Sequence, residues 1–572
     1  MEKWVLSAKK ADFRKIAEQF NIDAVTAALI RNRDIIGAEE IKEYLHGNLQ
    51  SLHNPLEMKD VSKATQLLEQ AISQGKRIRV IGDYDIDGIM SSYILLQGLT
   101  AVSAKVDVAI PHRINDGYGI NIALIEQAAQ DGIDTIITCD NGISAKEQIA
   151  VAKELGLTVI ITDHHEVPYQ EEGGERREVL PPADAILNPK QAECPYPFKE
   201  LCGAGVAYKL IIAVYQHFNL PENKHEELLE YVAIATIGDV MDLVGENRIL
   251  VKEGLKCLQH TPNRGLQALI KVNKLELGNI STYHIGFVLG PCLNASGRLD
   301  VAMRGLELLK ATDDNQAAVI AGDLKSLNDT RKEMTAEGLE AAIAAVEEGT
   351  LSEDRVLVVY LPDCHESLAG IIAGRLRERY YKPTFILTNG EEGVKGSGRS
   401  IEAYSMYEEM VKCQELFDRF GGHPMAAGLS LNAHAGVEQF RHRINEQCTL
   451  TADDLTEKVK IDVAMPLSYI RRELITEMEL LQPFGKGNSK PVFAQKNITL
   501  QGPRILGKNQ NVVKMKAIDE HGFAMDALYF GDGEEFLAKI SGEQAVAITY
   551  YPAINSYMGK ETLQVTISHV SK

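Results

Sequence analysis

The stretch VIGDYDIDGI, residues 80–89, places three aspartates at alternate positions directly after a short apolar run. Crowded carboxylates repel one another, so a chain that groups them needs a compensating partner. Residues two apart in an extended segment point the same way, so Asp83, Asp85 and Asp87 are predicted to face one point together. Gly88 fits a close approach of the backbone where a strand turns into a helix.

The sequence around this stretch alternates between short apolar runs and helical segments. The strand-like runs are RIRVI, KVDVAI, TIIT and TVIIT, at residues 77–81, 105–110, 135–138 and 158–162. Segments with helical patterning lie between them, at residues 90–99, 121–130 and 144–155. Short apolar strands separated by helices of this length indicate βαβ units, and therefore an α/β domain built on a parallel sheet.

Acidic and imidazole side chains follow the strands of this predicted sheet. They are Asp83, Asp85 and Asp87 after the first strand, Asp140 after the third, His164 and His165 after the fourth, and Asp239 after a helix predicted to end near residue 237. Open α/β sheets bind their ligands beyond the carboxyl ends of the strands. We therefore expect these side chains to converge on one site at that edge.

A group of carboxylates of this size is stable beside a cation. Oxygen and imidazole ligands without a thiolate suit Mn²⁺ or Mg²⁺ better than structural zinc, and the candidate ligands are numerous enough for two ions. Two metals about 3.5–4 Å apart clamp an in-line phosphoryl displacement. An EF-hand calcium loop is disfavoured, because Leu95 and Leu96 stand where its glutamate belongs. Taken singly, each acid or histidine has a structural alternative as a turn, surface or helix-end residue.

Three further regions follow along the chain. Residues 302–348 are rich in Ala, Leu, Glu and Lys and lack Pro, which indicates a long helical connector. A second, smaller α/β block begins at residues 355–361, and β-patterned runs from residue 458 onward indicate a barrel or sandwich, with an OB-like barrel as one candidate. The predicted regions are an N-terminal helical region at 1–60, the first α/β domain at 61–300, the connector at 301–350, the second α/β domain at 351–450 and the β-barrel at 455–572.

Composition limits the class of protein. The 572 residues carry a formal net charge of −20, which argues against non-specific coating of nucleic acid but not against an enzyme whose acidic site binds metal. No apolar run approaches the roughly 18–20 residues of a membrane span, and the N-terminal residues lack a secretory signal. None of the eight cysteines forms a CxxC motif. We therefore expect a cytoplasmic protein with reduced thiols.

Several motifs resemble a known superfamily. DYDIDG, CDNG, DHH and GDVMD, in this order, resemble the DHH phosphoesterases. Further motifs are similar to those of the bacterial RecJ exonucleases, which also contain a DHHA1 domain. These are LNASGRLD, HESLAGIIAGRLRERYYKPTFIL, KGSGRS, FGGHPMAAG and QPFGKGNSKPVF, at residues 293–300, 365–387, 395–400, 420–428 and 482–493. The resemblance extends from about residue 76 to the C-terminus.

This resemblance implies a metal-dependent exonuclease that degrades single-stranded DNA from the 5′ end, in DNA repair and recombination. It implies DHH, DHHA1 and OB-like domains, and it makes a helicase and a single-strand-binding protein candidate partners. The implied metal ligands are Asp83, Asp85, Asp87, Asp140, His164 and Asp239, with Asp140 bridging two ions. The implied catalytic residues are His165, Asp140 and His164, of which His165 contacts the scissile phosphate or assists proton transfer.

Five residues are predicted to bind substrate. Arg298 and Arg399 are flanked by small residues and are predicted to bind the 5′-phosphate, because a guanidinium matches phosphate oxygens bidentately. Ser397 adds a hydroxyl donor. Gly422 and His423 are predicted to form a tight turn that holds nucleic acid. The alternative is a structural role, as ion-pair residues for the arginines and as a hydrogen-bonded turn for the histidine.

Other functions stay open at this point. A DHH phosphodiesterase acting on short oligonucleotides or cyclic dinucleotides is the main alternative, but such small substrates do not need a long chain with a β domain. A pyrophosphatase is disfavoured for the same reason, and a metal-free adaptor is disfavoured by the complete set of acids and histidines. The β domain also has the composition of a single-strand groove. Its candidate residues are Lys508, Lys514, Lys516, Tyr550, Tyr551 and Tyr557.

Overall fold

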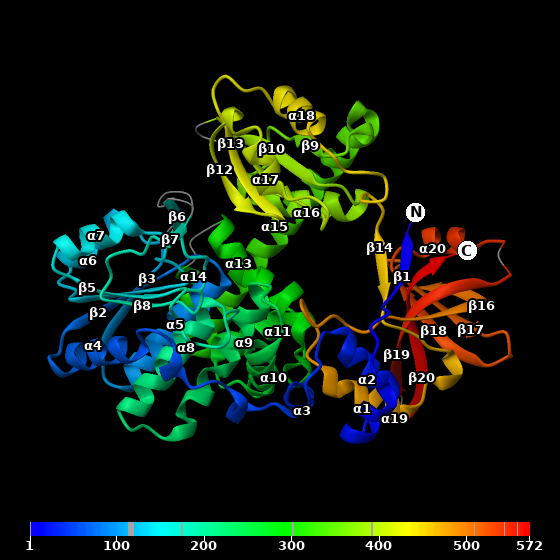
Figure 1. The fold of residues 1–572 in the computed structure, drawn as a ribbon, viewed down its shortest axis with the longest axis horizontal. Coiled ribbons are helices and arrows are strands. Elements are labelled where there is room, and N and C mark those ends of the chain that lie inside the picture. The colour runs from blue at the N-terminus through cyan, green and yellow to red at the C-terminus, as the bar shows by residue number, and fades with distance from the viewer. Residues whose placement is uncertain are drawn as a thin grey trace. The chain divides into compact units, whose positions relative to one another are not determined.

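The computed structural model describes residues 2–111, 119–172, 175–299, 303–390, 393–507, 509–542, 544–557 and 559–571. The chain divides into two compact units. The first unit comprises residues 4–294, 305–318 and 460–572, and the second unit comprises residues 1–3, 295–304 and 319–459. Figure 1 labels their helices and strands.

The first unit contains a five-stranded sheet in which every pairing is parallel. Its strands, in spatial order, are β3 (Lys105–Ala109), β2 (Arg77–Gly82), β4 (Thr135–Cys139), β5 (Thr158–Thr162) and β8 (Ala185–Leu187). The predicted parallel α/β fold is confirmed. The short strand β8 was not predicted, since three residues carry no pattern of their own. Parallel pairing brings the loops after β2, β4 and β5 to one edge.

Helices cover both faces of this sheet (Figure 1). One face carries α4 (Val61–Ser73), α5 (Ile86–Ala101) and α8 (Gly203–His217), and the other carries α6 (Ile122–Gln130) and α7 (Lys146–Glu154). Ile136 and Val159 of the sheet share a buried core with Ile125 of α6 and Ile149 of α7. Burial on both faces explains why β4 and β5 contain no charged residue.

Further helices complete this part of the first unit. They are α9 (Leu229–Gly238), α10 (Gly245–Leu258), α11 (Arg264–Val272), α12 (Thr282–His284), the π-helical turn η5 (Ile285–Leu289) and α13 (Gly290–Leu299), which runs into the second unit. α10 packs closely on α9: a Cβ at Gly254 would lie 2.3 Å from the carbonyl oxygen of Leu229. A short antiparallel pair, β6 (Tyr169–Glu172) with β7 (Glu175–Glu178), follows β5.

The C-terminal part of the first unit is a closed sheet, which confirms the OB-like prediction. Its strands are β15 (Val463–Ala464), β16 (Phe493–Leu506), β17 (Val512–Ile518), β18 (Ala524–Phe530), β20 (Lys560–Ser571) and β19 (Val546–Tyr557), and β16 also pairs with β19. That pairing closes five of the strands on themselves. α19 (Arg472–Met478) precedes β16, and α20 (Gly533–Ile540) joins β18 to β19.

The N-terminal helices share the core of this barrel. They are α1 (Phe13–Phe20), α2 (Ala24–Asn32) and α3 (Ala38–His46). Leu29 and Leu45 belong to one buried cluster with Phe493 and Tyr550. Tyr550 was a candidate for stacking on DNA, but it is 1% exposed and its hydroxyl donates to the carbonyl oxygen of Met465 at 2.6 Å. Its place in the core contradicts that prediction.

The second unit contains a five-stranded mixed sheet, in the order β12-β13-β11-β10-β9. Its strands are β9 (Leu357–Tyr360), β10 (Thr384–Gly390), β11 (Gly393–Arg399), β12 (Phe417–His423) and β13 (Ala426–Leu431), and only β9 pairs in parallel. Its helices are α16 (Glu366–Tyr380), α17 (Met406–Val411) and α18 (Val437–Glu446). The predicted smaller α/β domain is therefore confirmed.

The predicted single connector consists of two helices, α14 (Met303–Lys310) and α15 (Asp314–Glu348). Asp313 separates them, because its carboxylate accepts hydrogen bonds from the backbone N–H groups of Asn315 and Gln316 and so starts a new helix. β1 (Lys3–Leu6) pairs with β14 (Lys458–Ile461).

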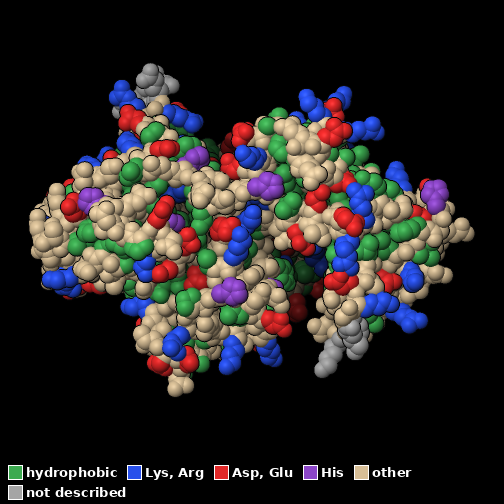
Figure 2. Space-filling view, turned by 90° about the horizontal axis from the view of Figure 1, so that it is seen from below, with side chains coloured by type: hydrophobic (Ala, Val, Ile, Leu, Met, Phe, Trp, Pro, Cys, Tyr) green, Lys and Arg blue, Asp and Glu red, His purple; other side chains and the backbone are tan. Residues whose placement is uncertain are grey.

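Surface character agrees with a chain that carries charges of both signs. On the face shown in Figure 2, acidic and basic side chains are interspersed despite the net charge of −20. Within the described ranges, no helix combines the length and the apolarity that crossing a membrane requires.

Candidate metal centre

The loops after β2, β4 and β5 and the end of α9 bring all seven predicted acids and histidines together. These residues form three sets, and within each set the ligand atoms all lie within 4.8 Å of one another. They are Asp83 with Asp85 and Asp140, Asp87 with His164 and Asp239, and Asp140 with His164 and His165. Asp140 and His164 each belong to two sets, so the three sets form one continuous centre.

The three aspartates of the opening stretch reach this centre by a route that was not predicted. The segment is not extended, because α5 begins at Ile86 with Asp85 as its N-cap. The Asp85 carboxylate accepts hydrogen bonds from the N–H groups of Asp87 at 3.0 Å and Gly88 at 3.1 Å. Asp83 follows the strand end and Asp87 lies in the first helical turn, so the expectation that alternation aligns all three is wrong. Asp87 belongs to a different set from Asp83 and Asp85.

Two glycines allow this crowding. A Cβ at Gly88 would lie 2.3 Å from the carbonyl oxygen of Asp83, and a Cβ at Gly203 would lie 2.7 Å from the Cβ of Asp140. Both distances are shorter than any real side chain tolerates. The close backbone approach predicted for Gly88 therefore occurs, and α8 approaches Asp140 in the same way.

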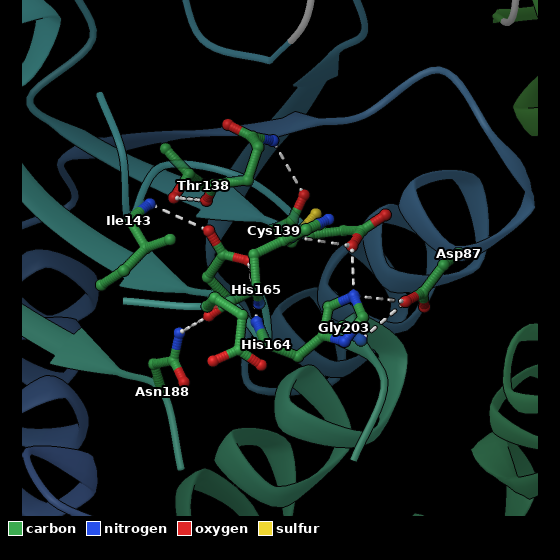
Figure 3. A network of polar contacts seen from close by, with 12 residues as sticks. Asp87, Thr138, Cys139, Ile143, His164, His165, Asn188 and Gly203 are labelled. Atoms are coloured by element: carbon green, nitrogen blue, oxygen red, sulfur yellow. Dashed lines mark hydrogen bonds and ion pairs between the residues drawn. The ribbon is translucent and has the colours of Figure 1, made fainter. Parts of the chain in front are cut away.

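The N-terminus of α8 holds Asp87. The N–H of Gly203 donates to Oδ2 of Asp87 at 2.6 Å, and the N–H of Ala204 donates to Oδ1 at 2.7 Å. Figure 3 shows Asp87 beside Gly203. These donors and the helix dipole favour the carboxylate, yet burial and the charge of Asp85 raise its pKa to about 6.

His164 lies close to three of the carboxylates, of which Figure 3 labels Asp87. Its Nε2 lies 3.1 Å from Oδ1 of Asp140, 3.6 Å from Oδ2 of Asp87 and 3.8 Å from Oδ2 of Asp239. Burial, together with the charge of His165, lowers the pKa of His164 to about 3. The imidazole is therefore neutral, which is the form that coordinates a metal.

The donor set fits a divalent cation. Burial, followed by the charge of Asp87, raises the pKa of Asp140 well above its usual range and that of Asp239 to about 8. Burial and like charges therefore both disfavour the ionised acids in this site. A cation supplies the balance, and carboxylate oxygens with a neutral imidazole are ligands that suit Mn²⁺ or Mg²⁺.

Asp163 orients His165, a role that was not predicted although Asp163 belongs to the DHH motif. Its Oδ1 accepts from the backbone N–H of His164 at 2.7 Å and lies 2.8 Å from Nδ1 of His165, while Oδ2 accepts from the N–H of Ile143 at 2.9 Å. Burial alone lowers the pKa of His165, but the hydrogen bond and charge of Asp163, with the charge of Asp239, outweigh it and raise the pKa to about 9. The His165 side chain is 43% exposed. It therefore presents a protonated imidazole at an accessible edge of the centre.

Two asparagines that carried no predicted role support the loops. The amide of Asn141 donates to the carbonyl oxygens of Ile81 at 3.1 Å and Cys139 at 2.9 Å. Oδ1 of Asn294 accepts from the N–H of Ile86 at 2.9 Å, at the start of α5. Asn141 belongs to the CDNG motif and Asn294 to the LNASGRLD motif. Their place in these motifs was the sequence feature that could have indicated a role at the site.

The backbone is strained at two positions of the centre. Asp140 has φ of 60° and Val240, next to Asp239, has φ of 57°. A β-branched residue in the left-handed region is a genuine outlier. Strain of this kind costs on the order of 1–3 kcal/mol and concentrates where function needs an exact side-chain placement.

Ser397 and Arg399 come together in the second unit. They stand two apart on β11 and therefore share a face, which packs on α16. A Cβ at Gly370 would lie 2.7 Å from Nη2 of Arg399 and 3.2 Å from Oγ of Ser397. Burial and the charge of Arg377 lower the pKa of Arg399. Nη1 of Arg399 donates to the carbonyl oxygen of its neighbour Gly398 at 2.7 Å, and no carboxylate within the described ranges pairs with it.

His423 shares that face of the sheet, since it pairs with Ala426, which in turn pairs with Arg399. The tight turn predicted at residues 421–424 begins later than expected: Gly422 and His423 end strand β12 and pair with β13, and the turn consists of Pro424 and Met425. Arg298 belongs to α13, but its side chain lies outside the described residues.

Acids and a neutral imidazole at the carboxyl edge of a parallel sheet, followed by a mixed α/β domain and an OB-like barrel, define a phosphoesterase of the DHH class. Comparison with family models supports this class along the chain. The N-terminal domain of the DHH family matches residues 77–236, the DHHA1 domain matches residues 353–450, and the RecJ OB domain matches residues 461–569.

Curated relatives narrow the class. The single-stranded-DNA-specific exonuclease RecJ of Bacillus subtilis (strain 168) is 37% identical over 570 residues, which cover 99% of this chain and 70% of that protein. The corresponding protein of Escherichia coli (strain K12) is 31% identical over 97% of this chain and 98% of its own length. The crystal structure of RecJ in complex with Mn²⁺ from Thermus thermophilus matches 100% of this chain and 79% of that one, with a TM-score of 0.83 and 26% identity. The chain belongs to the RecJ family.

Proposed function

We propose that this protein is a metal-dependent exonuclease that hydrolyses single-stranded DNA from the 5′ end to mononucleotides, in DNA repair and recombination. The observation that supports this most strongly is the continuous centre of acids and histidines at the edge of the parallel sheet, in a chain whose curated relatives are single-stranded-DNA-specific exonucleases.

The ligand sets support two ions, Mn²⁺ or Mg²⁺. Solved RecJ structures of Thermus thermophilus contain one or the other. In this protein, one ion would be held by Asp83, Asp85 and Asp140, and a second by Asp87, His164 and Asp239. Asp140 is the proposed shared ligand, since its Oδ1 lies 3.1 Å from Nε2 of His164. When bound, such a pair stabilises the attacking and leaving oxygens of an in-line displacement and acidifies the attacking water.

The protein's own residues prepare the reaction. The backbone donors of α8 fix Asp87, and the N-cap bonds of Asp85 fix the start of α5, so the ligands need little reorganisation. His165 is charged, accessible and oriented by Asp163. We assign it to the scissile phosphate, where it donates a hydrogen bond to a phosphate oxygen or a proton to the departing 3′ oxygen.

The 5′-phosphate is assigned to the second unit. Arg399 is a largely buried cation that only a backbone carbonyl partners within the described ranges, and Ser397 adds a hydroxyl beside it. An anion with several oxygens completes such a site. Gly422 and His423 lie along the same sheet and are assigned to the strand backbone, and the resemblance adds Arg298. The resemblance also supports a helicase and a single-strand-binding protein as partners.

We also propose the domain boundaries predicted from the sequence: residues 1–60, 61–300, 301–350, 351–450 and 455–572. The family matches fall within the second, fourth and fifth of these regions.

The test offers the purified protein, with Mn²⁺, a 40-nucleotide single strand labelled at its 5′-phosphate, the same strand in a blunt duplex, and a dinucleotide. We expect labelled mononucleotide to be released from the single strand and not from the duplex, and EDTA to abolish the release. Activity confined to the dinucleotide would instead favour a phosphodiesterase of short oligonucleotides and would reject the proposal.

A further inference from the structure

Two aromatic side chains on the helical run after α11 are exposed to solvent. Tyr283 of α12 is 62% exposed and Phe287 of η5 is 64% exposed. Their ring centroids lie 5.1 Å apart, with 30° between the ring planes. Single exposed apolar side chains are common on protein surfaces. Two neighbouring exposed rings are less ordinary, because each offers a face on which a further ring can stack.

The helical run that carries these rings is packed against the metal-binding loops. A Cβ at Gly286 would lie 3.7 Å from Cγ2 of Ile237, and a Cβ at Gly290 would lie 3.3 Å from Cδ1 of Ile86. The same run supplies Asn294, which accepts the N–H of Ile86. Ile237 and Ile86 each stand within two residues of a proposed metal ligand. The aromatic pair therefore belongs to a segment that directly supports the metal centre.

The backbone of this segment contains an unusual turn. The N–H of Gly290 donates to the carbonyl oxygen of Ile285, five residues earlier, so η5 is a π-helical turn between α12 and α13. Single π-turns inside helices are rare and occur frequently at functional sites. Phe287 lies within the turn and Tyr283 one turn before it.

An exposed cation lies on a segment that contacts the helical run of the aromatic pair. The hydroxyl of Thr282 donates to the carbonyl oxygen of Phe484 at 2.9 Å, which ties the run to the segment that precedes β16. Two residues later, Nζ of Lys486 lies 3.2 Å from Oδ1 of Asp242, and the Lys486 side chain is 60% exposed. The N–H of Leu243, four residues after Asp239, donates to the carbonyl oxygen of Lys486 at 2.8 Å.

Grooves for single-stranded nucleic acid combine these two elements, cations that follow the phosphates and aromatic rings on which successive bases stack. We infer that Tyr283 and Phe287 form a platform on which bases of the uncleaved single strand stack beside the metal centre, with Lys486 contacting a phosphate. The inference rests on the proposed function and names the surface that holds the bases. Because duplex bases stack on each other and offer no free face, the platform also favours single strands.

The experiment measures kcat/KM for 5′-phosphorylated oligonucleotides from 2 to 20 nucleotides, with Mn²⁺. In the wild type we expect kcat/KM to rise with length until the strand covers the platform. In a Tyr283→Ala, Phe287→Ala double variant, we expect the ratio of kcat/KM for the 20-mer to that for the dinucleotide to fall about tenfold or more. Stacking of one base on an aromatic ring contributes roughly 5- to 150-fold. The loss is expected mainly in KM, and Tyr283→Phe with Phe287→Trp should restore it, since any aromatic face can stack.

Phe530→Ala is the matched control, since it removes an aromatic ring of β18 that is 58% exposed. We expect its length dependence to equal that of the wild type. Both platform rings are exposed, so the double variant should fold, and its unfolding midpoint checks this; the single variants replace it if it does not.

If the double variant were active and showed the length dependence of the wild type, the platform would be rejected and the proposed function would stand. A change in oligomeric state without a change in DNA affinity would also reject the platform, because the rings would then form a protein contact. A wild-type protein that left every single strand intact would overturn the proposed function, and the platform with it.

Discussion

Each unit of this chain has a site where ionisable groups of one sign lie close together, but the sign differs between the two sites. In the first unit, burial and neighbouring carboxylates raise the pKa values of Asp87, Asp140 and Asp239. In the second unit, burial and the charge of Arg377 lower the pKa of Arg399. In the first site the carboxylates outnumber the one charged imidazole, His165, and in the second site Arg399 has no carboxylate partner within the described ranges.

A third buried site shows what a balanced arrangement looks like. Lys209 and Glu246 are both almost fully buried, and their charged atoms lie 2.7 Å apart. A buried charge without a partner is far more costly than a pair of this kind. The difference supports the proposal that the acids of the first unit bind cations and that Arg399 of the second unit binds an anion.

Removing the shared acid should have the largest effect. Asp140→Asn keeps the size of the side chain but removes the charge that two ligand sets share. We expect the rate of single-strand hydrolysis to fall more than about 100-fold. Loss of only the hydrogen-bond partner of a metal ligand can already lower activity by roughly that factor. In the wild type, saturation with Mn²⁺ at about 100 times its dissociation constant should add about 2.7 kcal/mol of stability, and the variant should lose this gain.

Asp107→Asn is the control for this variant. Asp107 lies on β3 of the same sheet and pairs with Arg79 at 2.7 Å, apart from the ligand sets. Its activity with Mn²⁺ should stay close to that of the wild type. Normal cleavage by the Asp140 variant would contradict the proposal that the acidic site works by binding cations.

Asp163→Asn should have an intermediate effect, because it changes the orientation and charge of His165 and leaves the proposed ligands in place. We expect kcat to fall about 10- to 100-fold. The pKa of His165, about 9 in the wild type, should fall toward its ordinary value. A protonated His165 would then be lost at lower pH, so the alkaline limb of the pH–rate profile should move to lower pH. A loss of rate with an unmoved alkaline limb would contradict the assigned role of His165.

Arg399→Gln, which changes the site of the second unit, should have the smallest effect. We expect the preference for a 5′-phosphate over a 5′-hydroxyl end to fall about tenfold, since a charged hydrogen bond contributes about 1.5–3 kcal/mol. The unfolding midpoint of the free protein should not fall, because the variant removes a partly buried cation that lacks an acidic partner within the described ranges. Arg375→Gln, an exposed position of α16, serves as the control. An unchanged end preference would reject the phosphate assignment.

The sheet and the membership of the site were predictable from the sequence, whereas the local geometry was not. Apolar runs followed by acids located β2, β4 and β5 and the edge at which their loops meet. The alternation of Asp83, Asp85 and Asp87 suggested an extended segment, but the N-cap bonds of Asp85 start α5 within it. A capping side chain and a metal ligand are the same residue type, so the pattern could not separate the two roles.

Contacts between distant segments account for the rest. Asp87 is held by the N-terminus of α8, more than a hundred residues further along the chain. The N-terminal helices share a core with the barrel at the other end of the chain, and Tyr550 belongs to that core. No local pattern in one sequence indicates these pairings, because each depends on the tertiary fold.

The most direct test of the central claim is anomalous diffraction from crystals of this protein grown with Mn²⁺. We predict two anomalous peaks about 3.5–4 Å apart. One should be coordinated by Asp83, Asp85 and Asp140, and the other by Asp87, His164, Asp239 and the shared Asp140. Crystals with saturating Mn²⁺ that showed no peak within about 2–2.5 Å of the Asp140 carboxylate would contradict the account.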